Sequence, residues 1–277
     1  MAVASTPRTR ARSVSDRDEI GSFLRRDRLY AAYALGDLDG PNRSRVEWGM
    51  AYDEAGRPTA LVMHHEGLVP QPMFLMGAPD GCRSVLESVI RPRDAYVQAT
   101  EIHEAAIRDL YELDDPLLML RMVVDRDTFE PFAGPSERLA APDIDDLNRL
   151  YQLGFRAGFP GSVVEDGVYF GVRVRGRLVS AAGTHAVNLR EGIAVVGNVM
   201  THADYRGHDF AKMVTSAVTA ALLERVTDVA LNVHADNEPA VAAYARLGYR
   251  VHCQLIERLA RRRAGGWGLM RPLREAM

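Results

Sequence analysis

Residues 199–214 read VMTHADYRGHDFAKMV and place a short basic turn, YRGHD at 205–209, between two apolar runs. The run before it, GIAVVGNVMT, predicts a buried strand, and the run after it has helical spacing. A strand, a glycine-containing turn and a helix together can hold a phosphate, because the first turn of a helix presents unpaired N–H groups and the positive end of its dipole. Asp209 is the unexpected residue in this turn, since an anion site disfavours a second negative charge.

A second pattern follows about 30 residues later, in DNEPAVAAYARLGY at 236–249. A short buried strand, DVALNV, comes before it. Asn237 is a typical N-cap, Pro239 falls in the first turn, and Gly248 stands just past the last turn. These residues predict a helix of two to three turns with defined ends.

Taken in order, these two patterns resemble the GNAT superfamily of acyl-CoA-dependent N-acyltransferases. The family's phosphate motif, Q/R-x-x-G-x-G/A, aligns with RGHDFA from Arg206 to Ala211, with Asp209 in place of the central glycine. The family's second motif, N-x-x-A-x-x-x-Y-x-x-x-G-F/Y, is complete, with Asn237, Ala240, Tyr244, Gly248 and Tyr249. The resemblance covers residues 140–260 well, and residues 15–125 only in the order of elements.

The resemblance implies a site for acetyl-CoA or another acyl-CoA. The pyrophosphate would lie on the turn and the first helical residues, and the pantetheine would pair with the edge of the preceding strand, where a backbone amide can also polarise the thioester carbonyl. The expected cofactor-binding residues are Val199, Met200, Thr201, Arg206, Gly207, His208, Asp209, Phe210, Ala211, Asn237 and Tyr244.

Three residues are candidates for the chemistry. Tyr244 occupies the family position of the general acid, where a phenol can protonate the departing thiolate. Many relatives carry a glutamate base on the strand before the phosphate motif, but residues 193–201 contain no carboxylate. Asn198 could hold a water or the acceptor, and His185 on the neighbouring strand could titrate near neutral pH. A bound water with no dedicated side chain is the alternative base.

The order of expected elements repeats along the chain. Both halves read helix, antiparallel strands, helix, strand, helix, strand, with a proline-rich stretch between them. The sequence therefore predicts an α/β fold (an α+β mixed sheet) made of two tandem GNAT-like domains, each a mostly antiparallel central sheet flanked by helices. The expected boundaries are a flexible tail at 1–13, a degenerate GNAT-like domain at 14–127, a linker at 128–140 and the acyltransferase domain at 141–277. The last strand is expected to close the second domain.

Composition excludes several classes of function. A formal net charge of -3 argues against a general nucleic-acid or membrane-surface binder, and no apolar run reaches transmembrane length. The two cysteines favour a reducing cytoplasm over a disulfide framework. His64-His65-Glu66 and His103-Glu104 lack the i, i+4 histidine pair of a zinc helix, so no metal site is expected.

These observations predict an N-acetyltransferase that moves an acetyl or other acyl group from CoA to the amine of a small molecule by direct attack in a ternary complex. The stretch 154–167 is expected to shape the acceptor site, and the protein to be a monomer or homodimer. Two alternatives stay open. One is a non-catalytic GNAT-fold protein that binds a ligand or partner, and the other is peptidyl or aminoacyl transfer on the same fold.

Overall fold

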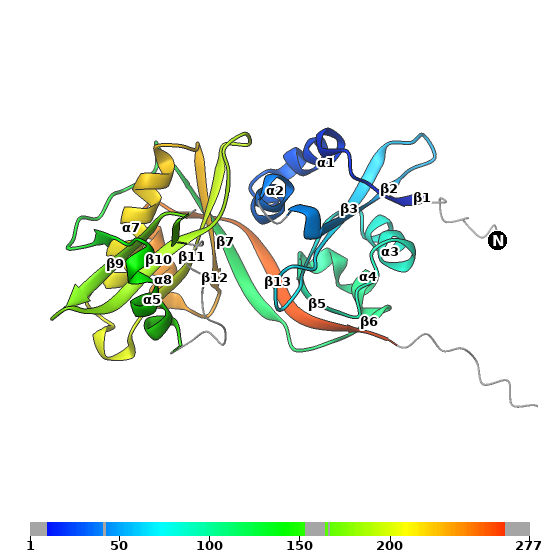
Figure 1. Cartoon of the computed structure of the whole chain (residues 1–277). Helices are drawn as coiled ribbons and strands as arrows, with labels where there is room; N and C mark the ends of the chain where they lie inside the picture. The colour runs from blue at the N-terminus through cyan, green and yellow to red at the C-terminus, as the bar shows by residue number, and fades with distance from the viewer. Residues whose placement is uncertain (1–9, 41–42, 153–163, 166, 264–277) are drawn as a thin grey trace, which may run out of the picture.

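One mixed sheet runs through the whole molecule (Figure 1). The computed structural model describes residues 10–40, 43–152, 164–165 and 167–263. The strands follow the order β1-β2-β3-β4-β5-β13-β7-β12-β11-β10-β9-β8, and β6 pairs with β13 off this path. The mixed α/β fold predicted from the sequence is confirmed.

The first half alternates helices and strands as expected. Its helices are α1 (Arg17–Leu24), α2 (Ala32–Asp39), α3 (Pro79–Ser88) and α4 (Glu104–Arg108), with short 3-10 turns at Arg25–Asp27, Arg43–Arg45 and Glu101–His103. Its strands are β1 (Arg10–Ser13), β2 (Val46–Tyr52), β3 (Pro58–His65), β4 (Pro72–Gly77), β5 (Asp94–Ala99), β6 (Tyr111–Leu113) and β7 (Leu117–Asp125).

The second half repeats this order. Its helices are α5 (Ile144–Tyr151), α7 (Phe210–Leu223) and α8 (Glu238–Ala245), with 3-10 turns at Ala141–Asp143 and Ala203–Tyr205. Its strands are β8 (Glu137–Arg138), β9 (Tyr169–Val174), β10 (Arg177–Asn188), β11 (Ile193–Thr201), β12 (Asp228–His234) and β13 (Arg250–Arg262). In each half a strand, a helix and a second strand parallel to the first stand in the same order: β4-α3-β5 and β11-α7-β12.

The two halves exchange their last strands. β7, from the first half, pairs antiparallel with β12, and β13, from the second half, pairs antiparallel with β5 and β6. β7 and β13 also pair with each other, which joins the two half-sheets at the centre of Figure 1. The expectation that the last strand closes the second domain by itself was therefore wrong. The apolar pattern of a strand predicts which face it buries and carries no information on its neighbour.

The helices cover the second half-sheet on both faces. Alternate residues of β11 point to opposite faces: Ala194 and Val196 join a core with α7, while Ile193 and Val195 join a core with α2 of the first half. A close approach fixes the α2 contact, since a Cβ on Gly36 would lie 2.6 Å from the Cβ of Ala186. A helix of the first half thus forms part of the core around the second half-sheet.

Two further findings concern the sequence predictions. Residues 10–13, expected within a flexible tail, form β1 and pair with residues 49–52 of β2, because the tail's backbone completes an otherwise open sheet edge. Within the described residues, no helix is long and apolar enough to cross a membrane.

Candidate functional site

The turn before α7 adopts an unusual backbone. Gly207 has φ 79° and Asp209 has φ 59°, both in the left-handed region, and α7 begins at the next residue, Phe210. The first backbone bond of the helix runs from Met213 N to Asp209 O at 3.0 Å. Two left-handed residues flanking His208 fold the chain into a concave turn.

This turn presents a row of unused donors. In the described part of the chain, the backbone N–H groups of residues 207–212 donate no hydrogen bond. A left-handed residue followed by a right-handed one turns successive N–H groups toward one point, as in an anion-binding nest, and left-handed Asp209 followed by helical Phe210 has this arrangement. The helix dipole adds a positive potential at the same place. The predicted pyrophosphate loop therefore has donors suited to an anion.

Asp209 is explained by the backbone. Its position requires a positive φ, which glycine supplies freely and which aspartate tolerates better than most residues because its short side chain adapts to the left-handed region. Its carboxylate pairs with Lys212 one turn later, Oδ1 to Nζ 3.1 Å. Lys212 is the sole lysine of the chain and also lies over the ring of Phe132, 3.9 Å from its centroid. The negative charge at the turn is therefore partly compensated.

The strands beside this turn separate. Only Ile193–Val196 of β11 pair with β12, where their partners are Asp228–Leu231, and both strands continue beyond this pairing. β11 keeps its pairing with β10 as far as Thr201, and β12 keeps its pairing with β7 as far as His234. The backbone of Val199, Met200 and Thr201 thus has one edge without a strand partner, as the resemblance to the GNAT superfamily implies for pantetheine.

A β-bulge shapes this open edge. Gly183 faces Gly197 and Ala181 faces Met200, so two residues of β11 oppose one residue of β10. Asn198, in the bulge, has φ 55°, another left-handed position that asparagine tolerates.

Two tyrosines fix Asn198. Tyr151 Oη donates to Asn198 O at 2.7 Å, and Asn198 Nδ2 donates to Tyr169 Oη at 3.0 Å. Both rings are buried. Sequence reasoning named Tyr169 only as an aromatic residue near the acceptor-shaping stretch and missed Tyr151, because neither belongs to a motif and each reaches the bulge from a different element. Asn198 therefore has a demonstrable role in holding the bulge, while its proposed role in catalysis stays a prediction.

The second motif builds α8. The side chain of Asn237 accepts a hydrogen bond from Ala240 N at 3.3 Å, which confirms the predicted N-cap. Gly248 has φ 88°, and a Cβ there would lie 1.8 Å from Thr128 O. Tyr249 is buried, and its hydroxyl bonds that of Thr219 at 2.7 Å. Much of this motif is therefore required by the local packing.

Tyr244 is buried in the core beneath α7, and burial raises its pKa to about 12. The phenol is therefore protonated at neutral pH. Its hydroxyl makes no hydrogen bond within the described residues, so it is available to a ligand. Val199, Tyr205 and Phe210 pack against the same core, which brings Tyr244, the open strand edge and the phosphate turn into one region.

His185 lies on the other face of the sheet. Its ring meets that of Tyr33 on α2 at 4.8 Å between centroids, and a Cβ added at Gly197 would lie 3.1 Å from the Cβ of His185. Desolvation by the groups packed around the ring and the nearby Arg121 guanidinium lower its pKa to about 4, although the residue as a whole is exposed to solvent. The imidazole is therefore neutral at physiological pH, and it is a weaker base than a histidine tuned to neutrality.

α2 adds groups that sequence reasoning missed. Asp37 follows Tyr33 by one helical turn, so both residues lie on the same side of α2, and Asp37 Oδ1 is 3.9 Å from His65 Nε2 of the first half. Burial raises the pKa of Asp37 to about 7. Arg121 is fully buried nearby, with its guanidinium 4.9 Å from the Tyr33 ring centroid. The missing signal was topological, because the sequence pattern did not place a helix of the first half against β10.

The corresponding turn of the first half is less suited to an anion. Pro79 opens α3 and has no N–H group, and Ala78 N is already bonded to Thr59 O at 2.9 Å. These two losses agree with the interpretation of that half as a degenerate repeat. Most of the stretch predicted to shape the acceptor site, at 154–167, lies outside the described residues.

These features together define a class of fold: an open strand edge after a bulge, next to the N-terminus of the following helix. Residues 170–258 match the family described as FR47-like protein. No curated protein sequence matches the chain closely enough to count as a relative.

Solved structures extend the likeness to nearly the whole chain. A GCN5-related N-acetyltransferase from Kribbella flavida is 16% identical with a TM-score of 0.61, covering 86% of this chain and 95% of its own. A tandem GNAT protein from the clavulanic acid biosynthesis pathway is 15% identical with a TM-score of 0.53, covering 92% of this chain and 98% of its own. An acetyltransferase of the GNAT family from Colwellia psychrerythraea is 13% identical with a TM-score of 0.56, covering 91% of this chain and 100% of its own. The chain has the GNAT fold, as the sequence resemblance predicted.

Proposed function

We propose that the protein is an N-acyltransferase that moves an acetyl or other acyl group from acyl-CoA to the amine of a small molecule, in a ternary complex. The observation that carries the proposal is the end of β11–β12 pairing beside a turn with six consecutive unused N–H groups. A thioester substrate that ends in a pyrophosphate-linked nucleotide needs both features, an anion site and a backbone edge, side by side.

Different residues of this chain would bind different parts of acyl-CoA. Acyl-CoA, when bound, supplies the activated thioester. The N–H groups of 207–212 would hold the pyrophosphate, with Arg206 adding a charge at the rim. The free edge of Val199–Thr201 would pair with the pantetheine amides and turn an N–H group toward the thioester carbonyl.

Tyr244 would donate the proton that the departing thiolate takes up. Its pKa of about 12 keeps it protonated across the physiological range, so the proton is present when the C–S bond breaks. The amine's own proton needs an acceptor. Neutral His185, on the neighbouring strand β10, is the candidate for that role, and a bound water held near Asn198 is the alternative.

The acceptor class follows from charge and location. A net charge of -3 offers no general surface for nucleic acid, and the groups near His185 come from both halves. We therefore infer that the first half forms one wall of the acceptor site, and that the acceptor is a small amine. The two cysteines favour a reducing cytoplasm, where acyl-CoA is available.

An amine-panel assay that follows free thiol release from acetyl-CoA tests the proposal. We expect at least one amine to raise thiol release, and Tyr244→Phe to lower turnover about tenfold with little change in KM, because a thiolate is already a fair leaving group. Tyr52→Phe is the matched control: it removes a tyrosine hydroxyl in the first half, which bonds Glu19, and should leave turnover unchanged.

The alternative, a non-catalytic protein on the same fold, gives a different result. In that case Tyr244→Phe would leave thiol release at the background level of the unaltered chain for every amine. Asp209 at the family's glycine position and the absence of a carboxylate in the β11 sequence motivate this alternative.

A further inference from the structure

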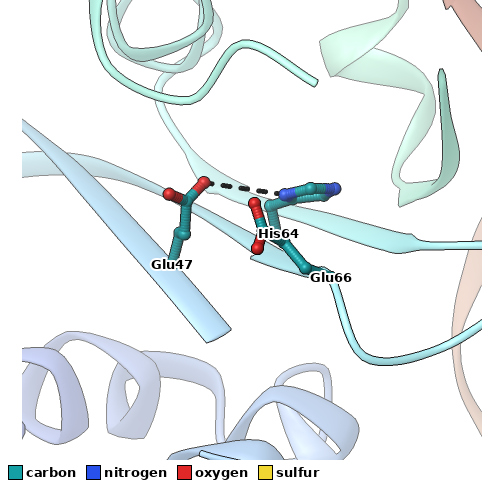
Figure 2. A group of neighbouring side chains, drawn as sticks. All are labelled: Glu47, His64 and Glu66. Carbon is teal, nitrogen blue, oxygen red and sulfur yellow. Dashed lines mark ion pairs between the residues drawn. The ribbon is translucent and has the colours of Figure 1, made fainter. Parts of the chain in front are cut away.

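Three side chains of the first half converge at one end of β2 and β3, remote in sequence from the transfer site. Glu47 and His64 are direct cross-strand partners, and Glu66 follows His64 by two residues. Residues two apart in extended chain and residues directly opposite on neighbouring strands point to the same face. Figure 2 shows the two carboxylates and the imidazole turned toward one another.

The geometry of the three groups is that of a ligand set. One ligand atom from each residue lies within 4.8 Å of the other two, and His64 Nδ1 is 3.7 Å from Glu47 Oε2. Bonds of about 2.1 Å to a common ion place ligand atoms about 3–4 Å apart. Both glutamates are exposed, so small rotations can bring their oxygens to bonding distance.

His64 supplies an independent observation. Its side chain is only 4% exposed, and Nδ1 is buried without a hydrogen-bond partner. Nε2 is 3.2 Å from Gln71 Oε1, an acceptor, so the ring hydrogen belongs on Nε2 and Nδ1 keeps a lone pair. Buried nitrogens rarely go unpaired, because the lost hydration is not recovered. A ring whose far nitrogen donates to an oxygen while the near one faces carboxylates is the usual arrangement of a metal-binding histidine.

Electrostatics also favours a cation here. Within the described residues, neither the Glu47 nor the Glu66 carboxylate has another ion-pair or hydrogen-bond partner. Two carboxylates and a nitrogen lone pair repel one another unless a positive charge lies between them. A divalent ion would satisfy all three groups at once.

We propose that Glu47, His64 and Glu66 bind one divalent transition-metal ion, with Zn²⁺ as the preferred species and water completing the coordination. One imidazole and two carboxylates suit zinc and its first-row neighbours, whereas Mg²⁺ and Ca²⁺ prefer oxygen ligands alone. Because both glutamates are exposed, the site is accessible from solvent. The inference is independent of acyl transfer.

The test is calorimetric titration of ZnCl₂ into the full chain after its metals are stripped with a chelator. We expect one equivalent to bind with micromolar or tighter affinity, and Glu47→Gln to weaken binding at least tenfold. Glu47 is 54% exposed, so this variant should fold, which circular dichroism verifies. Glu112→Gln, an exposed glutamate on β6, is the matched control and should bind as the unaltered chain does.

Two further arms sharpen the result. Gln71→Met should weaken Zn²⁺ binding about tenfold by releasing the His64 ring, without removing a ligand. MgCl₂ and CaCl₂ should give no stoichiometric heat. The proposal is overturned if the unaltered chain binds less than one equivalent at 100 micromolar Zn²⁺, roughly the level expected of an adventitious surface site. It is also overturned if Glu47→Gln binds Zn²⁺ with unchanged affinity. That result would assign the metal to surface pairs such as His234 and Asp236.

Discussion

At the residue scale, backbone conformation accounts for the two polar residues that stand at unexpected places. Asp209 and Asn198 both have positive φ, at 59° and 55°, and both lie at positions where the chain changes direction beside the candidate site. Aspartate and asparagine tolerate this region better than other residues with a Cβ. Both residues are therefore compatible with an intact acyl-CoA site.

Substitution of Asp209 separates its conformational role from its charge. Asp209→Gly keeps the left-handed turn and removes the carboxylate, so we expect equal or greater stability and several-fold tighter binding of acetyl-CoA. Asp209→Ala removes the same charge but should be less stable than the glycine variant by about 1 kcal/mol. Thermal unfolding and calorimetric binding measure the two effects. Weaker binding by both variants would assign Asp209 a direct role in holding the ligand.

Gly248 gives a second residue-scale prediction. Gly248→Ala should lower the free energy of unfolding by roughly 3 kcal/mol, because a Cβ would lie 1.8 Å from a backbone oxygen. Gly176→Ala is the matched control, with φ 80° and nothing within 4 Å of the new Cβ, and should cost only about 1 kcal/mol. Urea denaturation distinguishes the two. Equal losses would mean that Thr128 moves aside at little cost.

His185 makes stability depend on pH. Its pKa is near 4 in the folded chain and about 6.5 when unfolded, so between these values the unfolded chain binds the extra proton. Stability should therefore fall as pH decreases from 6.5 to 4. His185→Gln should remove the decrease in the free energy of unfolding that His185 causes over this range, about 1 kcal/mol after allowance for the ring's contact with water. Tyr33 and Arg121 face the ring and remain in the variant. A pH profile parallel to that of the unaltered chain would refute the assignment.

At the scale of elements, the sequence predicted more of the site than of its surroundings. The hairpin β9–β10, strand β11, helix α7 and the cap of α8 follow from local pattern, because apolar period, glycine and an N-cap act within a few residues. Three other features depend on strand register and on helix packing between the halves. They are the anchoring of Asn198 by Tyr151 and Tyr169, the contact of α2 with β10, and the convergence of the proposed metal ligands Glu47, His64 and Glu66. The sequence search for histidine pairs at helical spacing missed Glu47 and His64 because those residues face each other across strands.

At the scale of the whole molecule, the halves share their structure. β7 and β13 each complete the other half's sheet, and one core contains Leu35 and Met50 of the first half with Val195 and Leu255 of the second. Arg25 and Glu191 pair across the halves at 2.8 Å. The division into domains at 14–127 and 141–277 stays a proposal, and the exchange of strands predicts that the two parts depend on each other for stability.

That dependence can be measured. Leu255→Ala empties a fully buried position of the shared core and should lower the free energy of unfolding by roughly 3 kcal/mol. Because the core is common, we expect one transition, with tryptophan fluorescence and far-ultraviolet circular dichroism shifting together. Two transitions, of which only one moves in the variant, would show that the halves unfold independently.

The central claim is that the turn before α7 and the open edge of β11 bind acyl-CoA. Titration of acetyl-CoA into the full chain, followed by calorimetry and thermal unfolding, tests it most directly. The account predicts saturable binding of one equivalent with a raised Tm, weakened severalfold by Arg206→Ala and unchanged by Arg225→Ala, an exposed arginine beyond the far end of α7. The absence of both binding heat and a Tm shift at millimolar acetyl-CoA would contradict the account.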